Sequence, residues 1–387
     1  MSRFILTPLL LAGFVAGCSD SGVSKVEEVE DAPDADEGPP DEPFSTDWGQ
    51  WLSMTTSPSG QPAITFYDRD RGGIGFALGE ISDGEVSWTF EGVDGYPGSS
   101  GLDPGDRGTY TSLAFGPDGT AWASYYDVGA RALRYGKRHP TLGAWSTGIA
   151  DTGEGSSKDA GLFSSIAIGA DGAPIIAHHD KGTGALRIAR WNGGEFVGGV
   201  FDRGEAFTAD TGTEDEDKDA NVGQFVRLRV VDGKEYMAYY DAANGDLKFS
   251  VGTDIEVVDS DGDVGQWPDF HVVGDTIHIV YQDGGNQQLK YAVGSPGSWT
   301  ISVIDDKPYT GADTALFFDG DDPRVAYFEG KANDMKLAKM SASVWSSSVV
   351  AAEGAVGFHN EVIQIDGQAY VGCYNYSKRN VYFAEID

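Results

Sequence analysis

The sequence has few cysteines and few positive charges, and each shortage limits what the protein can be. Only Cys18 and Cys373 occur among 387 residues, so no network of disulfides holds the fold together. Lysine and arginine number 27 against 61 aspartates and glutamates, which gives a formal net charge of −34. A chain this acidic repels nucleic acid and anionic lipid. We therefore expect an apolar core to provide the stability and no nucleic acid to bind.

Beyond the N-terminal segment, long apolar runs are also missing. The apolar runs are short and bounded by turn residues, and the chain is rich in glycine and aromatic residues. This composition favours many short strands over long helices, and it predicts an all-β fold. The length alone would allow two domains, although all-β proteins of this size often form one.

Residues 1–18 have the features of a secretion signal. A positive charge at Arg3 precedes an apolar stretch that is too short to span a membrane. The ending Val15-Ala16-Gly17-Cys18 resembles the lipobox of bacterial lipoproteins. This resemblance implies cleavage before Cys18 and a diacylglyceryl group on its thiol, which anchors the protein in the membrane. An ordinary signal peptide with a coincidental cysteine is the alternative.

The residues after Cys18 suggest where the protein is held. Lipoproteins kept at the inner membrane often carry aspartate directly after the lipidated cysteine, whereas this chain has Ser19. The resemblance therefore favours the outer membrane of the cell envelope. Residues 19–44 are acidic and include Pro33, Pro39 and Pro40, so they cannot bury enough apolar surface to fold. We predict a disordered tether.

A strand that ends in paired aromatic or similar residues and a polar, usually acidic, residue occurs seven times: at residues 63–68, 122–127, 175–180, 236–241, 278–283, 324–329 and 370–375. An apolar strand precedes each copy, a third strand follows it, and a fourth often opens with tryptophan. Four antiparallel strands repeated seven times predict a seven-bladed β-propeller over residues 45–387. The last repeat ends after three strands. Either residues 43–46 complete it, or the final blade has three strands.

The repeat resembles those of predicted propeller lipoproteins of Gram-negative bacteria, and more distantly those of sialidase-type and fucose-lectin propellers. The resemblance covers residues 45–387 and implies the fold. Sialidase-like enzymes use an arginine triad, a tyrosine with a carboxylate partner and a further acid, and none of these matches a motif here. The turns also differ from the Asp-box of those families.

The acids at the ends of the repeated strands are candidate rim residues. An aspartate before a turn accepts a hydrogen bond from the backbone two residues on, so turn capping is the favoured interpretation. The alternative is a ring of carboxylates that collects cations or sugar hydroxyls. The acids are Asp68, Asp127, Asp180, Asp241, Asp283 and Glu329.

Two acidic loops between repeats are candidate calcium sites, because carboxylates at alternate positions are typical of oxygen-ligand sites. One loop lacks the glycine and glutamate of an EF-hand, since Val264 and Phe270 occupy those positions. A screened, solvated surface is the favoured interpretation. The candidate ligands are Asp259, Asp261 and Asp263 in one loop, and Asp215, Asp217 and Asp219 in the other.

Other polar residues favour packing roles. His178 and His179 replace an aromatic pair and point to opposite faces of a strand, which favours packing over metal ligation. Arg227 and Asp269 occupy equivalent positions of consecutive repeats, and we predict an ion pair between them in the central channel. Glu361 occupies the same position in the last repeat. Cys373 lies in an apolar run and is expected to be buried and inert.

No catalytic motif and no asymmetric cluster of histidine and carboxylate is evident in the sequence. The leading hypothesis is a monomeric, non-enzymatic binding or scaffolding propeller for protein or glycan, held to the membrane only by its lipid. It needs no cofactor, with calcium as the open exception. A glycan-active hydrolase or lyase is the alternative and needs a pair of carboxyl groups. A structural envelope component without a ligand is the third possibility, because fold does not fix function.

Overall fold

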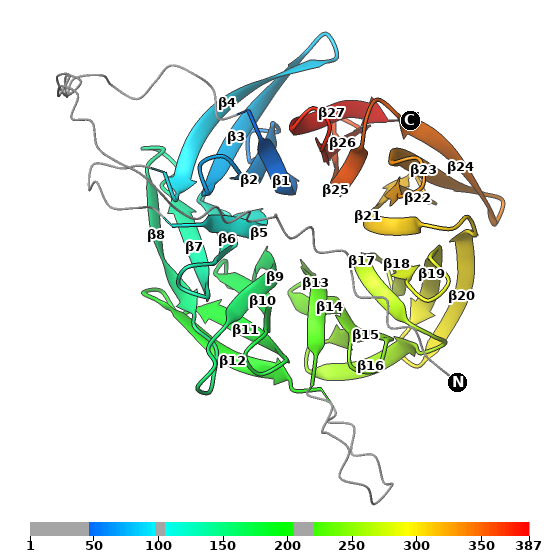
Figure 1. Ribbon diagram of the computed structural model, residues 1–387, viewed down its shortest axis with the longest axis horizontal. Helices are drawn as coiled ribbons and strands as arrows, with labels where there is room; N and C mark the ends of the chain where they lie inside the picture. Colours follow the sequence, from blue (N-terminus) through cyan, green and yellow to red (C-terminus); the bar gives the residue numbers. More distant parts are fainter. Residues whose placement is uncertain (1–45, 97–104, 205–219, 387) are drawn as a thin grey trace, which may run out of the picture. The chain divides into compact units, whose positions relative to one another are not determined.

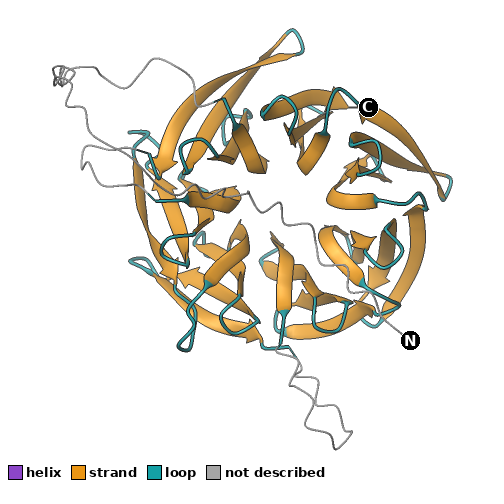
Figure 2. Cartoon of the chain, viewed as in Figure 1, coloured by secondary structure: helices purple, strands orange, loops and turns teal. Residues whose placement is uncertain are grey.

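The computed structural model describes residues 46–96, 105–204 and 220–386. These residues form 27 β-strands and no helix, as Figure 2 shows. No helix long and apolar enough to cross a membrane therefore occurs in them. Backbone contacts divide the chain into residues 1–42 and residues 43–387. Cys18, the expected signal at 1–18 and the expected tether at 19–44 lie outside the described residues.

Seven antiparallel sheets follow one another along the chain, and each is one blade of a β-propeller (Figure 1). Blade 1 contains β1 (Trp48–Thr56), β2 (Pro62–Asp68), β3 (Gly73–Ser82) and β4 (Glu85–Asp94). Blade 2 contains β5 (Arg107–Phe115), β6 (Ala121–Asp127), β7 (Ala132–Arg138) and β8 (Trp145–Asp151). Blade 3 contains β9 (Ala160–Ile168), β10 (Pro174–Asp180), β11 (Ala185–Trp191) and β12 (Phe196–Asp202).

The remaining blades complete the ring. Blade 4 contains β13 (Val222–Val231), β14 (Lys234–Asp241), β15 (Asp246–Val251) and β16 (Asp254–Asp259). Blade 5 contains β17 (Val264–Val273), β18 (Thr276–Asp283), β19 (Gln288–Ser295) and β20 (Ser298–Asp305). Blade 6 contains β21 (Thr310–Asp319), β22 (Asp322–Glu329), β23 (Asp334–Ser341) and β24 (Val344–Ala351). Blade 7 contains β25 (Val356–Ile365), β26 (Gln368–Asn375) and β27 (Asn380–Ile386).

The prediction of a seven-bladed all-β propeller is confirmed, and the first strand of each blade faces the centre (Figure 1). Six sheets have four strands, whereas blade 7 has three within the described residues. Residues 43–45 lie outside the described part and Thr46 belongs to no strand. The final blade therefore has three strands among the described residues, and the alternative that residues 43–46 complete it rests mainly on residues outside them.

The core lies between neighbouring blades, because each sheet is apolar on both faces. All seven residues of β2, β6 and β10 are buried. Phe249 of blade 4 packs edge to face on Phe270 of blade 5, with ring centroids 5.2 Å apart. Burial of a large side chain contributes roughly 1.5–3 kcal/mol, so repeated packing of this kind replaces the missing disulfides.

Candidate functional site

The first residue of each aromatic pair takes part in a repeated contact between blades. In five blades it lies beside an aspartate from the last strand of the preceding blade, and a lysine or arginine of the next strand binds the same carboxylate. The sequence analysis did not predict this role, and of the five aspartates it named only Asp259, as a calcium ligand. The five triads are Tyr125–Asp94–Arg134, His178–Asp151–Arg187, Tyr239–Asp202–Lys248, Tyr281–Asp259–Lys290 and Tyr327–Asp305–Lys336.

Blade 7 interrupts this pattern on both of its sides. Where blade 6 meets blade 7, the equivalent positions hold Ala351, Cys373 and Tyr382. Cys373 is fully buried, and this burial raises the pKa of its thiol, so it is an inert packing group. Where blade 7 meets blade 1, Phe66 and Gly75 occupy the positions of the tyrosine and the cation. Neither interface therefore has the buried polar triad.

The second residue of the aromatic pair reaches forward to the next blade. Four tyrosines donate hydrogen bonds of 2.5–2.7 Å to an aspartate that directly precedes the next inner strand. His179 replaces one tyrosine, and its Nδ1 lies 2.9 Å from the carbonyl oxygen of Val222. The four pairs are Tyr67–Asp106, Tyr126–Asp159, Tyr240–Asp263 and Tyr374–Asp47.

The third position of the repeat holds the six rim acids, and each accepts backbone N–H groups of its own turn. Asp241, for example, accepts from Ala243 and Asn244, and Glu329 accepts from Lys331 and Ala332. The same bond type occurs at Asp68, Asp127, Asp180 and Asp283. This geometry is the turn capping that the favoured interpretation describes.

The first candidate calcium loop is built from two of these repeated positions. Asp259 is the aspartate of a triad and binds Lys290 and Tyr281, while Asp263 accepts the hydroxyl of Tyr240. Burial opposes ionisation of Asp259, yet the bonds from Lys290 and Tyr281 outweigh it and lower its pKa. In the described part of the chain, no three His, Cys, Asp or Glu side chains converge on one point. The second loop, with Asp215, Asp217 and Asp219, lies outside the described residues.

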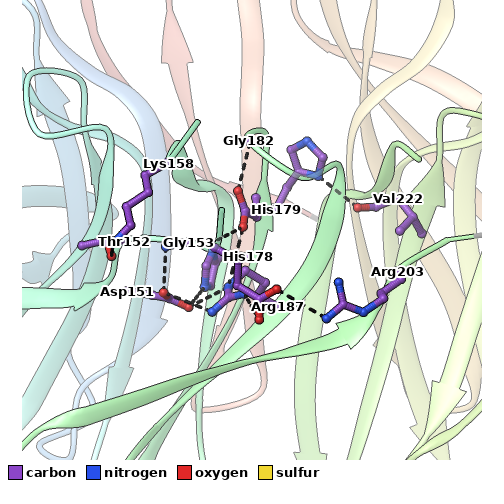
Figure 3. A network of polar contacts seen from close by, with 12 residues as sticks. Asp151, Thr152, Gly153, Lys158, His178, His179, Gly182, Arg187, Arg203 and Val222 are labelled. Carbon is purple, nitrogen blue, oxygen red and sulfur yellow. Dashed lines mark hydrogen bonds and ion pairs between the residues drawn. The ribbon is translucent and has the colours of Figure 1, made fainter. Parts of the chain in front are cut away.

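Blades 2 and 3 together form an asymmetric histidine–carboxylate cluster that the sequence analysis did not find (Figure 3). His178 Nε2 lies 3.3 Å from Asp151 Oδ2, and Arg187 Nε donates to the same oxygen at 2.9 Å. Glu154 extends the network, with one oxygen 3.3 Å from Arg187 and the other 3.4 Å from Arg203. The expectation that no such cluster exists was wrong, because its members lie on different blades.

This cluster is closed to substrate. His178 is 0 % exposed and Arg187 is 4 % exposed. Burial disfavours the charged form of Asp151, but His178 and Arg187 overcome this effect and lower its pKa strongly. Asp151 is therefore an ionised carboxylate buried between blades 2 and 3, where its pairing with His178 and Arg187 links the two blades. The cluster is the histidine version of the triads in the other blades.

The central channel is the place where the repeats stop being equivalent. Each inner strand carries a glycine followed two residues later by a side chain in the left-handed region, with φ between 46° and 55°. Six of these side chains carry an aromatic ring, and one is an aspartate. This repeated motif was not recognised in the sequence. The seven residues are Trp51, Tyr110, Phe163, Phe225, Trp267, Asp313 and His359.

The six rings form a nearly continuous stack around the channel, which we call the aromatic ring. From His359 through Trp51, Tyr110, Phe163 and Phe225 to Trp267, neighbouring centroids lie 4.0–4.7 Å apart. The interplanar angles of these ring pairs are 33–57°, close to the one-seventh of a full turn that relates adjacent blades. Asp313 interrupts the stack between Trp267 and His359.

The next layer of the channel holds charged residues. Arg227 Nη1 lies 2.7 Å from Glu361 Oε1, so an ion pair joins blades 4 and 7 across the channel. Asp269 binds Arg229 instead, at 2.7 Å. The expected direct pairing of Arg227 with Asp269 was wrong, because Arg227 reaches across the channel. Asp269 instead binds Arg229 of blade 4 and the backbone amides of Phe270 and Leu316.

Beyond this ion pair lies a polar cavity of about 430 Å³, which opens toward the turns between first and second strands. Ser53, Ser112 and Ser165 line one side. The Oγ of each serine accepts a hydrogen bond from a backbone amide of the next blade, and the serine hydroxyl can still donate its own hydrogen. Arg229 and His271 line the other side. Burial and the charge of Arg229 lower the pKa of His271 to about 4, so it is neutral at pH 7.

The seven sheets define the class as a seven-bladed β-propeller, and comparisons with known proteins support the fold and go no further. No protein-family model matches the chain, and no curated sequence matches it. Among solved structures, the polysaccharide lyase Uly1 is 12 % identical, covers 91 % of each chain and gives a TM-score of 0.53. YCF48 from Cyanidioschyzon merolae is 11 % identical over 89 % of this chain and 97 % of its own, with a TM-score of 0.52.

A prolyl endopeptidase structure is also similar, at 11 % identity and a TM-score of 0.52, but the match covers 50 % of that chain. At these identities the likeness shows the fold alone.

Proposed function

We propose that this protein is a non-enzymatic binding module of the bacterial envelope, anchored by a lipid on Cys18, whose propeller binds a glycan or protein in its channel. The observation that carries the proposal is the asymmetry of the channel. Carboxylates elsewhere in the repeat cap turns or join blades, whereas Arg227, Arg229, His271 and Glu361 gather in one cavity. A pocket with a few convergent polar groups is the usual form of a ligand site.

The chemistry of the cavity favours a glycan. Two arginines and three serine hydroxyls offer donors, and the volume of about 430 Å³ falls within the range of small-molecule sites. Asp269 and Glu361 balance the two arginines, so the cavity carries no net charge. A neutral or singly acidic sugar suits such a cavity better than a polyanion.

A glycan array and a pull-down from native membranes test this proposal. We expect the full chain to bind a restricted set of glycans and the Arg229→Ala variant to lose this binding. The matched control is Arg190→Ala, because Arg190 of blade 3 forms an exposed ion pair with Glu235 of blade 4, away from the residues that line this cavity. Equal binding by the native chain and Arg229→Ala would remove the cavity as the site.

A glycan-active enzyme is the second candidate, because two carboxyl groups of the channel have pKa values shifted in opposite directions. Burial raises the pKa of Glu361 despite Arg227, whereas Arg229 and Arg227 overcome burial and lower that of Asp269. Acid and base pairs of glycosidases show such a separation. Asp269, however, is 3 % exposed and already bonded by Arg229 and two backbone amides. Reducing-sugar release that disappears in Glu361→Gln would favour the enzyme.

The lipid anchor is tested separately. Changing Cys18 to Ser should abolish metabolic acyl labelling and move the protein from the membrane fraction to the soluble fraction. Cys373→Ser is the control, because that thiol is buried in blade 7. Retention of Cys18→Ser on membranes after a high-salt wash would contradict the anchor. Density separation of the two membranes checks the expected outer-membrane location.

A further inference from the structure

Asp313 is the single interruption of the aromatic ring, and its environment differs from that of the other channel carboxylates. Its backbone has the same left-handed conformation as the six ring-bearing residues, with φ of 50°. The strand geometry is therefore retained while the aromatic ring is replaced by a carboxylate. Its side chain is 11 % exposed, and it lines a cavity of about 120 Å³ at this end of the channel.

The carboxylate of Asp313 lacks the strong cationic partner that the other two have. Glu361 binds Arg227 at 2.7 Å, and Asp269 binds Arg229 at 2.7 Å. Among the described residues, only His359 lies within ion-pair distance of Asp313, with 3.6 Å between Nδ1 and Oδ1. Burial lowers the pKa of His359, so this imidazole is mostly neutral at pH 7. Burial therefore raises the pKa of the Asp313 carboxyl, and His359 and the more distant Arg227, which pairs with Glu361, offset this rise only in part. A cation bound directly to the carboxylate would stabilise its charged form.

The neighbours of Asp313 provide the other half of a cation site. Trp267 packs on Phe225 and His359 packs on Trp51, with tilted ring planes and centroids 4.6 and 4.7 Å apart. Asp313 comes between Trp267 and His359 in the order of the inner strands and carries no ring, so each of these two rings has an aromatic neighbour on one side and the Asp313 position, which we call the gap, on the other. The face of an indole carries negative charge density and attracts cations. The gap thus has an aromatic wall, an imidazole wall and a carboxylate.

We propose that this gap binds an alkylammonium group, with the ammonium on Asp313 and its carbon chain against Trp267. The site goes beyond the proposed glycan cavity, since the Arg227–Glu361 ion pair separates the two ends of the channel. Arg227 does not prevent cation binding, because Glu361 neutralises it. The net charge of −34 raises the local concentration of cations. The cavity of about 120 Å³ suits a small head group better than a sugar ring.

Titration calorimetry of the full chain with n-butylammonium tests this site, with n-butanol as the neutral control of similar shape. We expect butylammonium to bind and to change the tryptophan fluorescence, and butanol to do neither. Asp313→Asn should weaken binding by about tenfold or more, because the charge is lost. Asp313→Phe should abolish binding by completing the ring. Asp306→Asn is the control, since Asp306 is an exposed acid paired with Lys307.

Two further outcomes decide the proposal. If Nα-acetyl-lysine amide binds more tightly than butylammonium, the natural ligand is a lysine side chain of a protein partner. If butylammonium binds more tightly, the natural ligand is a small free amine. Equal affinity of the native chain and Asp313→Asn, or equal affinity for butylammonium and butanol, would overturn the site. Loss of glycan binding in Arg229→Ala does not bear on this result, because that residue lies at the other end of the channel.

Discussion

Tyr374 donates a hydrogen bond to Asp47 at 2.5 Å, although 327 positions separate the two residues. Tyr374 belongs to β26 of the last blade, and Asp47 directly precedes β1 of the first. The same bond links consecutive blades elsewhere, as in Tyr67–Asp106. A local repeat therefore also closes the ring between the two ends of the domain.

This relationship predicts the effect of removing one hydroxyl. Tyr374→Phe should lower the free energy of unfolding by about 1.5–3 kcal/mol, the range for hydrogen bonds to charged groups. Tyr67→Phe should lower the free energy of unfolding by a smaller amount, because its partner Asp106 is exposed whereas Asp47 is 4 % exposed. Urea unfolding followed by tryptophan fluorescence measures both. Equal losses would show that ring closure does not depend on this bond.

The glycines of the inner strands predict a steric effect. Gly161 has φ of 116°, and an added Cβ would lie 2.7 Å from Leu133 Cα of blade 2. Gly60 has φ of 81° and no atom within 4 Å of such a Cβ. Gly60→Ala should lower the free energy of unfolding by about 1 kcal/mol through backbone strain alone. Gly161→Ala should lower it several times more, because the clash with Leu133 adds to the strain. Similar melting temperatures for the two variants would contradict the close approach of blades.

His271 predicts a pH dependence of stability. Its folded pKa of about 4 lies below the usual 6.5, so the unfolded state binds its proton first as pH falls. Stability from this group is complete above pH 6.5 and falls as pH decreases to about 4, by at most about 3 kcal/mol. The groups near His271 are Arg229, Asp269 and His278.

The test compares His271→Gln with His139→Gln, since His139 is an exposed residue of the β7–β8 turn. Denaturant unfolding between pH 4 and pH 7 should show a shallower loss of stability for His271→Gln. An unchanged slope would exclude His271 as its source.

The bonds of Asp259 and Asp263 predict a weak response to calcium. We expect Ca²⁺ and Mg²⁺ at equal ionic strength to shift the melting temperature equally, through screening alone. A bound ion at a hundredfold excess over Kd would instead add roughly 2.7 kcal/mol, a shift of a few degrees. A calcium-specific rise that disappears in Asp261→Ala would show that the loop rearranges to bind metal.

The fold could be predicted because its signal is local and repeated. A buried strand such as Trp122–Asp127, within β6, shows its aromatic pair and acid in six consecutive residues. The triads were harder to find, because their aspartates end outer strands whose other residues are mostly exposed and vary between blades. Burial of β20, for instance, is confined mainly to Ile304 and Asp305.

The channel could be predicted only in part. Gly161-Leu162-Phe163 and its six counterparts were visible in the sequence, and an alignment of inner strands would have found them. The partners of Arg227 could not be found this way, because equivalent positions say nothing about how far a side chain reaches across a ring. The His178–Asp151 contact depends on the packing of two blades and has no local signature.

The absence of triads on both sides of blade 7 has a consequence for how the ring opens. Five interfaces contain a buried triad whose carboxylate would lose a cation and a ring partner on separation. The two beside blade 7 lack this triad, and they combine apolar groups such as Cys373 and Phe66 with single hydrogen bonds such as that of Tyr374 to Asp47. Opening should therefore begin there, as a sub-global fluctuation of β25–β27. In deuterium-exchange mass spectrometry, amides of these three strands would exchange ahead of those in blades 3–5. Blades 1–6 would then stay together while blade 7 separates from its two neighbours.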